Sequence, residues 1–447
     1  MKKCIVIILM LHLMIAPSPG QSVRELLKQA EANYPLLKAK GYEVAARKYQ
    51  VSYVQSSALP SLDAAYQLNY ATFNNITGMA VGQSFVPISG PPSTDNTYTP
   101  VFGTAAGLLL NWEPITFGQR KSRIESAKAF ADFQEADANN ELFQHQIRTI
   151  NAYLDVIMAE ELIKVYKKNL ERSADNVRIV RALTNSGLRP ATDTTLFNAE
   201  LSRARIELYS NEKLKAMQEV VFSEFLGGSL AYTVDTSFFK QLPKIATDTS
   251  FSNHPLIRVS ASRVLIGQQE KTALRRTLYP KLALWGTAYA RGSGIRYDGY
   301  VNSEDGLSFS RYNYGAGLIL SVPLLQFTSL RHQVNAQESI IKSDQEKLNL
   351  IKLQLDKQRE IAEITLNNAL KIAQESPSFY QSAEFSYRTL KSRYNSGLVN
   401  YADYIQAQYA LIKSETDLKR AYIEAWKALL YNAAVQGDIN IFLNQLN

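Results

Sequence analysis

Two stretches of the chain read almost alike: residues 185–193 are NSGLRPATD and residues 395–403 are NSGLVNYAD. Each has a glycine followed six residues later by an aspartate, and the two copies lie 210 positions apart. A glycine between two helix-forming segments is typical of a tight turn, because glycine adopts left-handed backbone angles without steric cost. The pair therefore predicts two helical hairpins of the same design.

Matching landmarks extend outward from these turns and keep the same order in both halves of the chain. The pairs are 33–36 with 253–256, Pro60 with Pro280, 107–110 with 317–320, Phe117 with Phe327, and Gly227 with Gly437. The offset is 220 for the first two pairs and 210 for the other three. We infer an internal duplication, with a longer loop in the first copy between Pro60 and Gly107.

The first twenty residues have the composition of a secretory signal. Lys2 and Lys3 precede an apolar run, which ends in the small-residue, helix-breaking segment 16–20 (APSPG). We expect residues 1–20 to form a signal peptide that is cleaved near Gly20, since the run is too short to span a bilayer. The only cysteine, Cys4, lies within it, so the mature chain is expected to form no disulfide and no thiolate metal site.

Charge and motif content exclude two broad classes. The chain of 447 residues has a net charge of +8, or +6 without Lys2 and Lys3, and no dense Lys/Arg tract, so no nucleic-acid partner is expected. His145, His254 and His332 are scattered, with no HExxH pair and no phosphate-binding loop. We therefore expect no catalytic residue, no bound metal and no cofactor.

Within each copy the pattern predicts a helix, two strands, a long helix and a further helix. Residues 22–58 have helical spacing with a break near Pro35. The long helices are expected at about 117–183 and 327–395, the second interrupted near Pro377, and their length suggests a coiled coil. Helices should follow each turn, at about 191–226 and 401–436. The last carries small residues that allow either a close neighbouring helix or plain burial: Ala407, Ala410, Ser414, Ala421, Ala425 and Ala428.

Alternating side chains predict strands at about 61–73, 100–113, 281–291 and 312–323. Such alternation is typical of a transmembrane β-strand and equally of a half-buried soluble sheet. The third strand is ambiguous, because Trp285 and Tyr289 oppose the leucines of the same segment. Long polar loops at 74–98 and 292–311 favour the membrane interpretation. Four strands cannot close a barrel, so several chains would have to combine them.

These features together resemble the TolC family of outer-membrane factors. The resemblance runs from about Val23 to Gly437, and its most specific part is Tyr394 and the NSGL turn followed by Asp403. It implies a mixed fold of α-helices and transmembrane β-strands. Three chains would contribute four strands each to one β-barrel, continued by a long α-helical coiled-coil periplasmic barrel. The parts would be two repeats at 21–227 and 253–437, an equatorial segment at 228–252 and a C-terminal tail at 438–447.

The resemblance also implies a function. The chain would be a homotrimeric exit duct in the cell outer membrane, extending into the periplasm and surrounded by outer-membrane lipid. It would serve a tripartite efflux or secretion system as a passive conduit rather than an enzyme. Its partners would be a periplasmic adaptor (membrane fusion) protein and an inner-membrane pump. The alternative is a periplasmic coiled-coil structural or adaptor protein without a pore of its own.

The family's entrance gate can be carried over residue by residue. Asp403 fits the first position of an inner aspartate ring, whereas the second position is Gln406. Tyr394 and Asp193 fit two of three latch positions; the third, an arginine in the family, is Val399 here. That ionic latch is therefore absent or rebuilt, with Arg189 as one candidate.

The same turns would dock the adaptor. These residues are Asn185, Ser186, Gly187, Leu188, Asn395, Ser396, Gly397 and Leu398. A simpler interpretation of the two aspartates stays open beside the gate, because a carboxylate near a helix N-terminus is stabilised by about 0.3–1 kcal/mol.

Overall fold

The computed structural model describes residues 23–72, 96, 98–228, 232, 235–245, 254–296 and 300–446. The expected signal peptide and most of loop 74–98 lie outside these residues. The chain divides into two compact units. The first comprises Met1–Ala45, Phe133–Arg263 and Asp344–Asn447, and the second Ala46–Asp132 and Val264–Ser343.

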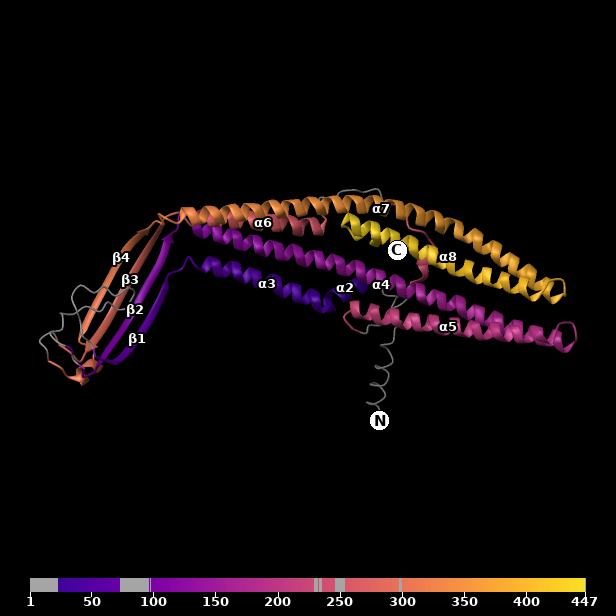
Figure 1. The fold of residues 1–447 in the computed structure, drawn as a ribbon, viewed down its shortest axis with the longest axis horizontal. Helices are drawn as coiled ribbons and strands as arrows, with labels where there is room; N and C mark the ends of the chain where they lie inside the picture. The colour runs from indigo at the N-terminus through magenta and orange to yellow at the C-terminus, as the bar shows by residue number, and fades with distance from the viewer. Residues whose placement is uncertain are drawn as a thin grey trace, which may run out of the picture. The chain divides into compact units, whose positions relative to one another are not determined.

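Each half of the chain runs from helix through two strands to two longer helices (Figure 1). The halves differ in detail, because α2 and α3 precede the strands in the first half and α6 alone does so in the second. The first series is α2 (Val23–Asn33), α3 (Pro35–Ser56), β1 (Ser61–Ala71), β2 (Val101–Ile115), α4 (Gln119–Asn185) and α5 (Ala191–Phe225). A short 3₁₀ helix, η2 (Thr236–Phe239), follows. The second series is α6 (Pro255–Arg276), β3 (Lys281–Ser293), η4 (Ser303–Leu307), β4 (Arg311–Ser321), α7 (Phe327–Asn395), α8 (Tyr401–Gln436) and α9 (Asn440–Leu443).

The expected long helices are confirmed, with one correction. The chain breaks between α2 and α3 next to Pro35, as expected, but α7 continues through Pro377 without interruption. A proline removes one helical hydrogen bond and usually kinks a helix. Here Ala373 and Ala383 are buried on either side of it, so packing along α7 outweighs this local cost. Within the described residues, no helix combines the length and the apolar composition needed to cross a membrane.

The second unit contains a four-stranded antiparallel sheet with the strand order β1-β2-β3-β4 (Figure 1). Its strands begin and end within two residues of the segments expected from alternation. Cross-strand partners share a face, and the register places Tyr66, Ala106, Ala290 and Tyr312 in one row. Every second residue along each strand joins the same face.

One face of the sheet is apolar and the other is polar. The apolar face carries Leu62, Ala64, Tyr66, Leu68, Tyr70, Phe102, Ala106, Leu108, Leu110, Leu284, Ala288, Ala290, Tyr312, Tyr314, Ala316, Leu318 and Leu320. The other face, here called the polar face, carries all the charged side chains of the paired segments, together with some apolar ones. Its polar residues include Asp63, Gln67, Asn69, Asn111, Lys281, Thr287, Arg291, Arg311, Asn313 and Ser321, and its large apolar residues are Val101, Leu109, Trp285, Tyr289 and Ile319. Among the described residues most of the apolar face is uncovered: Tyr314 is 92% exposed and Leu318 is 68% exposed. At one end Thr104, on the same face, is buried and donates to Gly306 O.

The register also settles the ambiguous third strand. Leu282 and Leu284 point to the apolar face, while Trp285 and Tyr289 lie on the polar face. The indole of Trp285 lies over Gly317 of β4, where an added Cβ would come within 2.6 Å of Nε1. Because Gly317 has no side chain, the Trp285 ring can lie against its backbone. This is how the polar face accommodates a large aromatic side chain.

The core of the first unit is centred on α8. Trp426 is buried and donates its indole N–H to the carbonyl oxygens of Phe238, at 3.1 Å, and Gln241, at 3.3 Å. Phe442 of α9 packs edge-on against the same indole ring. The described parts of segment 228–252 and of the C-terminal tail thus pack together on α8. The small residues of α8 are mostly buried: Ala410 is exposed, whereas Ala407, Ser414, Ala421, Ala425 and Ala428 are buried.

Substitution of Gly437 by alanine is expected to lower the apparent melting temperature of the protein. Gly437 ends α8 with φ of 75°, and an added Cβ would lie 2.8 Å from His254 Cδ2. The left-handed backbone alone costs an alanine roughly 1–2 kcal/mol. Gly41 provides a control of opposite sign, since it lies inside α3 with no atom near an added Cβ, so Gly41→Ala should stabilise slightly. Equal melting temperatures for the two variants would contradict this account.

Candidate functional site

The two NSGL turns have the same backbone structure. Gly187 and Gly397 adopt φ of 73° and 79°, which glycine tolerates best. At the first turn Leu188 N–H donates to Leu183 O, and at the second Leu398 N–H donates to Arg393 O, each at 2.9 Å. Each helix thus ends in a Schellman-type cap. All eight turn residues are exposed, including the two leucines, at 70% for Leu188 and 69% for Leu398.

Asp193 and Tyr394 are brought together behind these turns. Asp193 is the third residue of α5 and is only 8% exposed, and Tyr394, in the last turn of α7, is 1% exposed. The tyrosine hydroxyl donates to Asp193 Oδ2 at 2.6 Å. Burial and this bond to a carboxylate raise the pKa of Tyr394 above its ordinary value, so its hydroxyl remains a hydrogen-bond donor.

Arg189 connects the first turn to the second. Its Nη2 donates to Tyr394 O at 2.6 Å and to Val399 O at 3.0 Å. Its guanidinium also lies over the Tyr394 ring, 4.1 Å from the centroid, which is a cation–π distance. One side chain from the α4–α5 turn therefore holds both ends of the α7–α8 turn.

Aromatic rings fill the space around this contact. Phe197 of α5 lies edge-on to Tyr401, with centroids 4.9 Å apart, and Tyr394 is stacked with Tyr404 at 5.3 Å. The Tyr404 hydroxyl donates to Asn176 Oδ1 at 2.7 Å, which ties the aromatic cluster to α4. Burial is the main cause that raises the pKa of Tyr404, so this hydroxyl too stays neutral.

Asp403 and Gln406 lie apart from this buried contact. Both are exposed, and they are three residues apart on α8, so they share one side of the helix. Asp403 N–H is capped by Asn400 Oδ1 at 2.9 Å, and the carboxylate lies in the first turn of α8. The sequence-predicted residues thus form two groups, the buried pair Asp193–Tyr394 and the exposed pair Asp403–Gln406.

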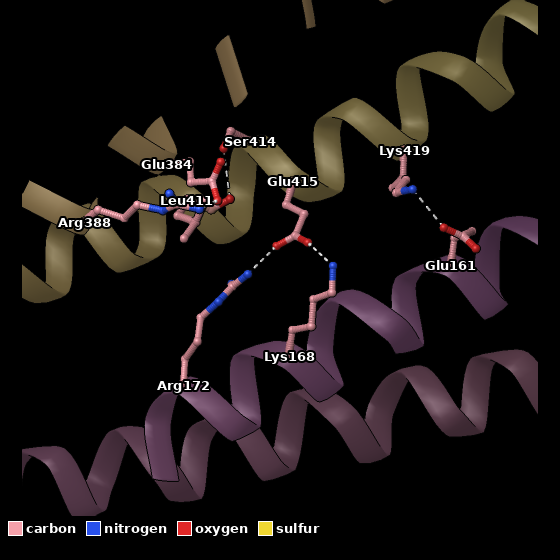
Figure 2. Close-up of polar contacts among 9 residues, drawn as sticks. All are labelled: Glu161, Lys168, Arg172, Glu384, Arg388, Leu411, Ser414, Glu415 and Lys419. Atoms are coloured by element: carbon pink, nitrogen blue, oxygen red, sulfur yellow. Dashed lines mark hydrogen bonds and ion pairs between the residues drawn. The ribbon is translucent and has the colours of Figure 1, made fainter. Parts of the chain in front are cut away.

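A band of polar side chains joins α4 to α8 farther from the turns. We call it the polar seam: Glu161, Asn169, Arg172, Ser173 and Asn176 of α4 with Gln408, Glu415 and Lys419 of α8. Gln408 bonds to Asn169, Ser173 and Asn176 at 2.9–3.1 Å. In Figure 2, Glu415 points from α8 toward Arg172 and Lys168, at 3.0 and 3.5 Å.

A second ion pair continues the seam. Glu161 accepts from Lys419 of α8 at 2.9 Å (Figure 2) and from Lys164 on its own helix at 2.6 Å. Burial alone would raise the pKa of Glu161, but the bonds to Lys164 and Lys419 outweigh burial and hold the pKa below its usual range. The seam lies between two hydrophobic clusters, one containing Ile157 and Trp426 and the other Phe197 and Leu411.

The seam and the contacts of Arg189 are the parts of the site that sequence reasoning missed or left open. The offset of 210 aligned Arg189 with Val399, but nothing in a single sequence shows which carbonyls an arginine will reach. The sequence contains one weak indication of the polar seam: Gln408 and Glu415 are polar residues on the otherwise apolar, buried side of α8. Across the described ranges, no group of three His, Cys, Asp or Glu side chains could hold a metal ion.

The described residues combine an antiparallel sheet of two unlike faces with long helices joined in hairpins. The chain belongs to the outer membrane efflux protein family, whose model matches residues 26–228 and 247–430. This is a family of channel proteins rather than of enzymes, and membership favours an efflux channel over a periplasmic coiled-coil adaptor. No curated protein sequence matches the chain.

Solved outer-membrane channels share the fold at low sequence identity. The Campylobacter jejuni CmeC channel has a TM-score of 0.75 at 15% identity, covering 94% of this chain and 86% of that one. VceC of Vibrio cholerae has 0.74 at 14%, covering 93% and 96%. The open state of the Neisseria gonorrhoeae MtrE channel has 0.74 at 12%, covering 93% and 89%.

Proposed function

We propose that three copies of the chain form the outer-membrane exit duct of a tripartite efflux or secretion system. The observation that carries the proposal is the sheet with one apolar and one polar face. In a membrane barrel one face of each strand meets lipid and the other meets a water-filled lumen. The apolar face would contact the outer-membrane lipid, and the polar face would line the conduit.

The edges of the sheet support assembly from several chains. In the order β1-β2-β3-β4, β1 and β4 are the edge strands, and lipid tolerates no open edge. Pairing β1 of one chain with β4 of the next closes the barrel. The number three, and hence twelve strands, comes from the resemblance to the TolC family.

The helices would extend the duct into the periplasm, and the NSGL turns would form its entrance. We infer that the chain matures by loss of residues 1–20 and consists of duplicated repeats, 21–227 and 253–437, with 228–252 and 438–447 as an equatorial belt. The exposed leucines at the turns, Leu188 and Leu398, suit an apolar contact with a periplasmic adaptor, which would link the duct to an inner-membrane pump.

Planar-bilayer conductance of the purified mature protein tests the proposed duct. Discrete conductance steps, together with heat-modifiable migration in gels, are expected of a membrane barrel. A folded, detergent-stable sample that never inserts would instead support the periplasmic coiled-coil alternative.

The pore is expected to prefer cations, and Asp403→Asn should weaken that preference. Asp403 is exposed near the entrance turn, and three such carboxylates around a narrow axis would attract cations. The measurement is the reversal potential under a salt gradient. Asp175→Asn is the control, since this carboxylate is exposed on α4 and pairs with Arg178. Unchanged ion selectivity in Asp403→Asn would show that Asp403 is not part of the gate.

A further inference from the structure

We infer that Arg189 is the positioning residue that ties the two hairpin turns together and thereby holds the proposed entrance closed. The inference rests on the proposed gate and extends it. Arg189 acts from the α4–α5 turn. The arginine that the resemblance would lead one to expect in the α7–α8 turn is replaced here by Val399.

Arg189 contacts the α7–α8 turn at both of its ends. Arg189 Nη2 binds Tyr394 O, which precedes the NSGL turn, and Val399 O, which follows it. Both ends of the turn are thus held from one point on the other hairpin. A planar guanidinium with several N–H donors can do this while its face rests on the Tyr394 ring; a lysine ammonium lacks the planar fork.

Charge favours the same arrangement. Tyr394 lies in the last turn of α7, where the helix dipole is negative. Its carbonyl oxygen accepts from Gly397 N–H at 3.0 Å and, with its second lone pair, from Arg189. A cation at this end is stabilised, and hydrogen bonds from a charged donor are stronger than neutral ones. Because the same tyrosine donates to Asp193, movement of the α7–α8 turn away from the α4–α5 turn would break the contacts of Arg189 and of Asp193 together.

The equivalent position in the second copy cannot play this part. Val399 lies 210 residues after Arg189 and packs against the hydrophobic cluster that contains Phe197 and Tyr404. Pro190, the N-cap of α5, has extended angles (φ −63°, ψ 146°), and a residue before proline avoids the helical conformation. Arg189 is thereby kept out of α5 and placed across the gap between the turns.

Single-channel conductance and a distance measurement on the full mature protein test the inference. Arg189→Gln removes the charge and the fork, and the time spent in the larger conductance state should rise roughly ten-fold. Arg189→Lys keeps the charge and should give a smaller rise. Arg178→Gln is the matched control: this arginine is also on the α4–α5 hairpin, its side chain is 80% exposed, and its loss should change nothing.

Pulsed EPR between spin labels at Ser186→Cys and Ser396→Cys reports the separation of the turns directly, with labelled chains diluted by unlabelled ones. Arg189→Gln should lengthen or broaden this distance. Wild-type distance and conductance in Arg189→Gln, while Tyr394→Phe raises conductance, would overturn the role of Arg189 and keep the gate. A changed distance with unchanged conductance would support the tie and overturn the gate.

Discussion

Conductance steps larger than those of the wild-type protein are expected when Asp193→Ala is combined with Tyr394→Phe. The 2.6 Å bond between these side chains joins α5 to α7 directly behind the turns. A bond to a charged partner contributes about 1.5–3 kcal/mol, enough to shift a closed–open equilibrium by roughly ten- to a hundred-fold. Removing both partners avoids an unsatisfied buried group, so the fold should survive. Planar-bilayer recording measures the effect.

The matched control removes the same chemical groups from exposed positions. Asp175→Ala with Tyr209→Phe takes a carboxylate from α4 and a hydroxyl from the surface of α5, and its conductance should equal that of wild type. If both double variants gave wild-type conductance steps, the proposed duct would be retained and the latch at the turns would be rejected.

The latch should also withstand alkaline conditions. Burial and Asp193 raise the pKa of Tyr394, so its stabilising bond is fully present below about pH 10, the ordinary tyrosine value. As the pH rises above that value toward the raised pKa, the contribution is lost. Low conductance is therefore expected up to about pH 10 in the wild-type protein.

Glu415→Ala should destabilise the protein by about 2–4 kcal/mol, because it leaves a largely buried cation unpaired. The Glu415 side chain is 5% exposed and that of Arg172 is 21% exposed, with 3.0 Å between their atoms. Arg172 Nη1 already has no hydrogen-bond partner in the part of the chain that the structure describes. The apparent melting temperature in detergent should fall by roughly 3–6 °C.

A second glutamate in Figure 2 supplies the control. Glu384 pairs with Arg388 along α7, where the arginine side chain is 73% exposed, and such pairs contribute little to stability. Glu384→Ala should therefore leave the melting temperature nearly unchanged. Similar shifts in Glu384→Ala and Glu415→Ala would show that the polar seam has no special energetic role.

Local patterns were enough to predict most of the fold. The paired glycines at 187 and 397 predicted the helical hairpins, and alternating side chains located the strands of the sheet. The features that were not predicted correctly depend on residues far away in the sequence. Alternation gives two faces for β3 without saying which is which, and only its pairing with β2 and β4 assigns Trp285 to the polar face. Likewise, packing on both sides of Pro377 kept α7 continuous.

The same reason limits prediction of the site. The resemblance proposed Asp193 and Tyr394 for the latch, and the structure places them in direct contact. Arg189 reaches carbonyls 205 and 210 residues away, and Arg172 meets Glu415 across 243 residues. A backbone carbonyl carries no side-chain identity, so no pattern in one sequence can single it out as the partner of an arginine.

The uncovered apolar face has a consequence for how the protein is made. In water a lone chain would expose tyrosines and leucines such as Tyr314 and Leu318. The outer edges of β1 and β4, which pair with no other described strand, add an aggregation hazard. A stable isolated subunit is therefore not expected, and the proposed assembly would complete folding, association and entry into lipid together. Substitutions in the sheet should consequently act on the yield of channels in the cell, while the channels that do assemble conduct normally.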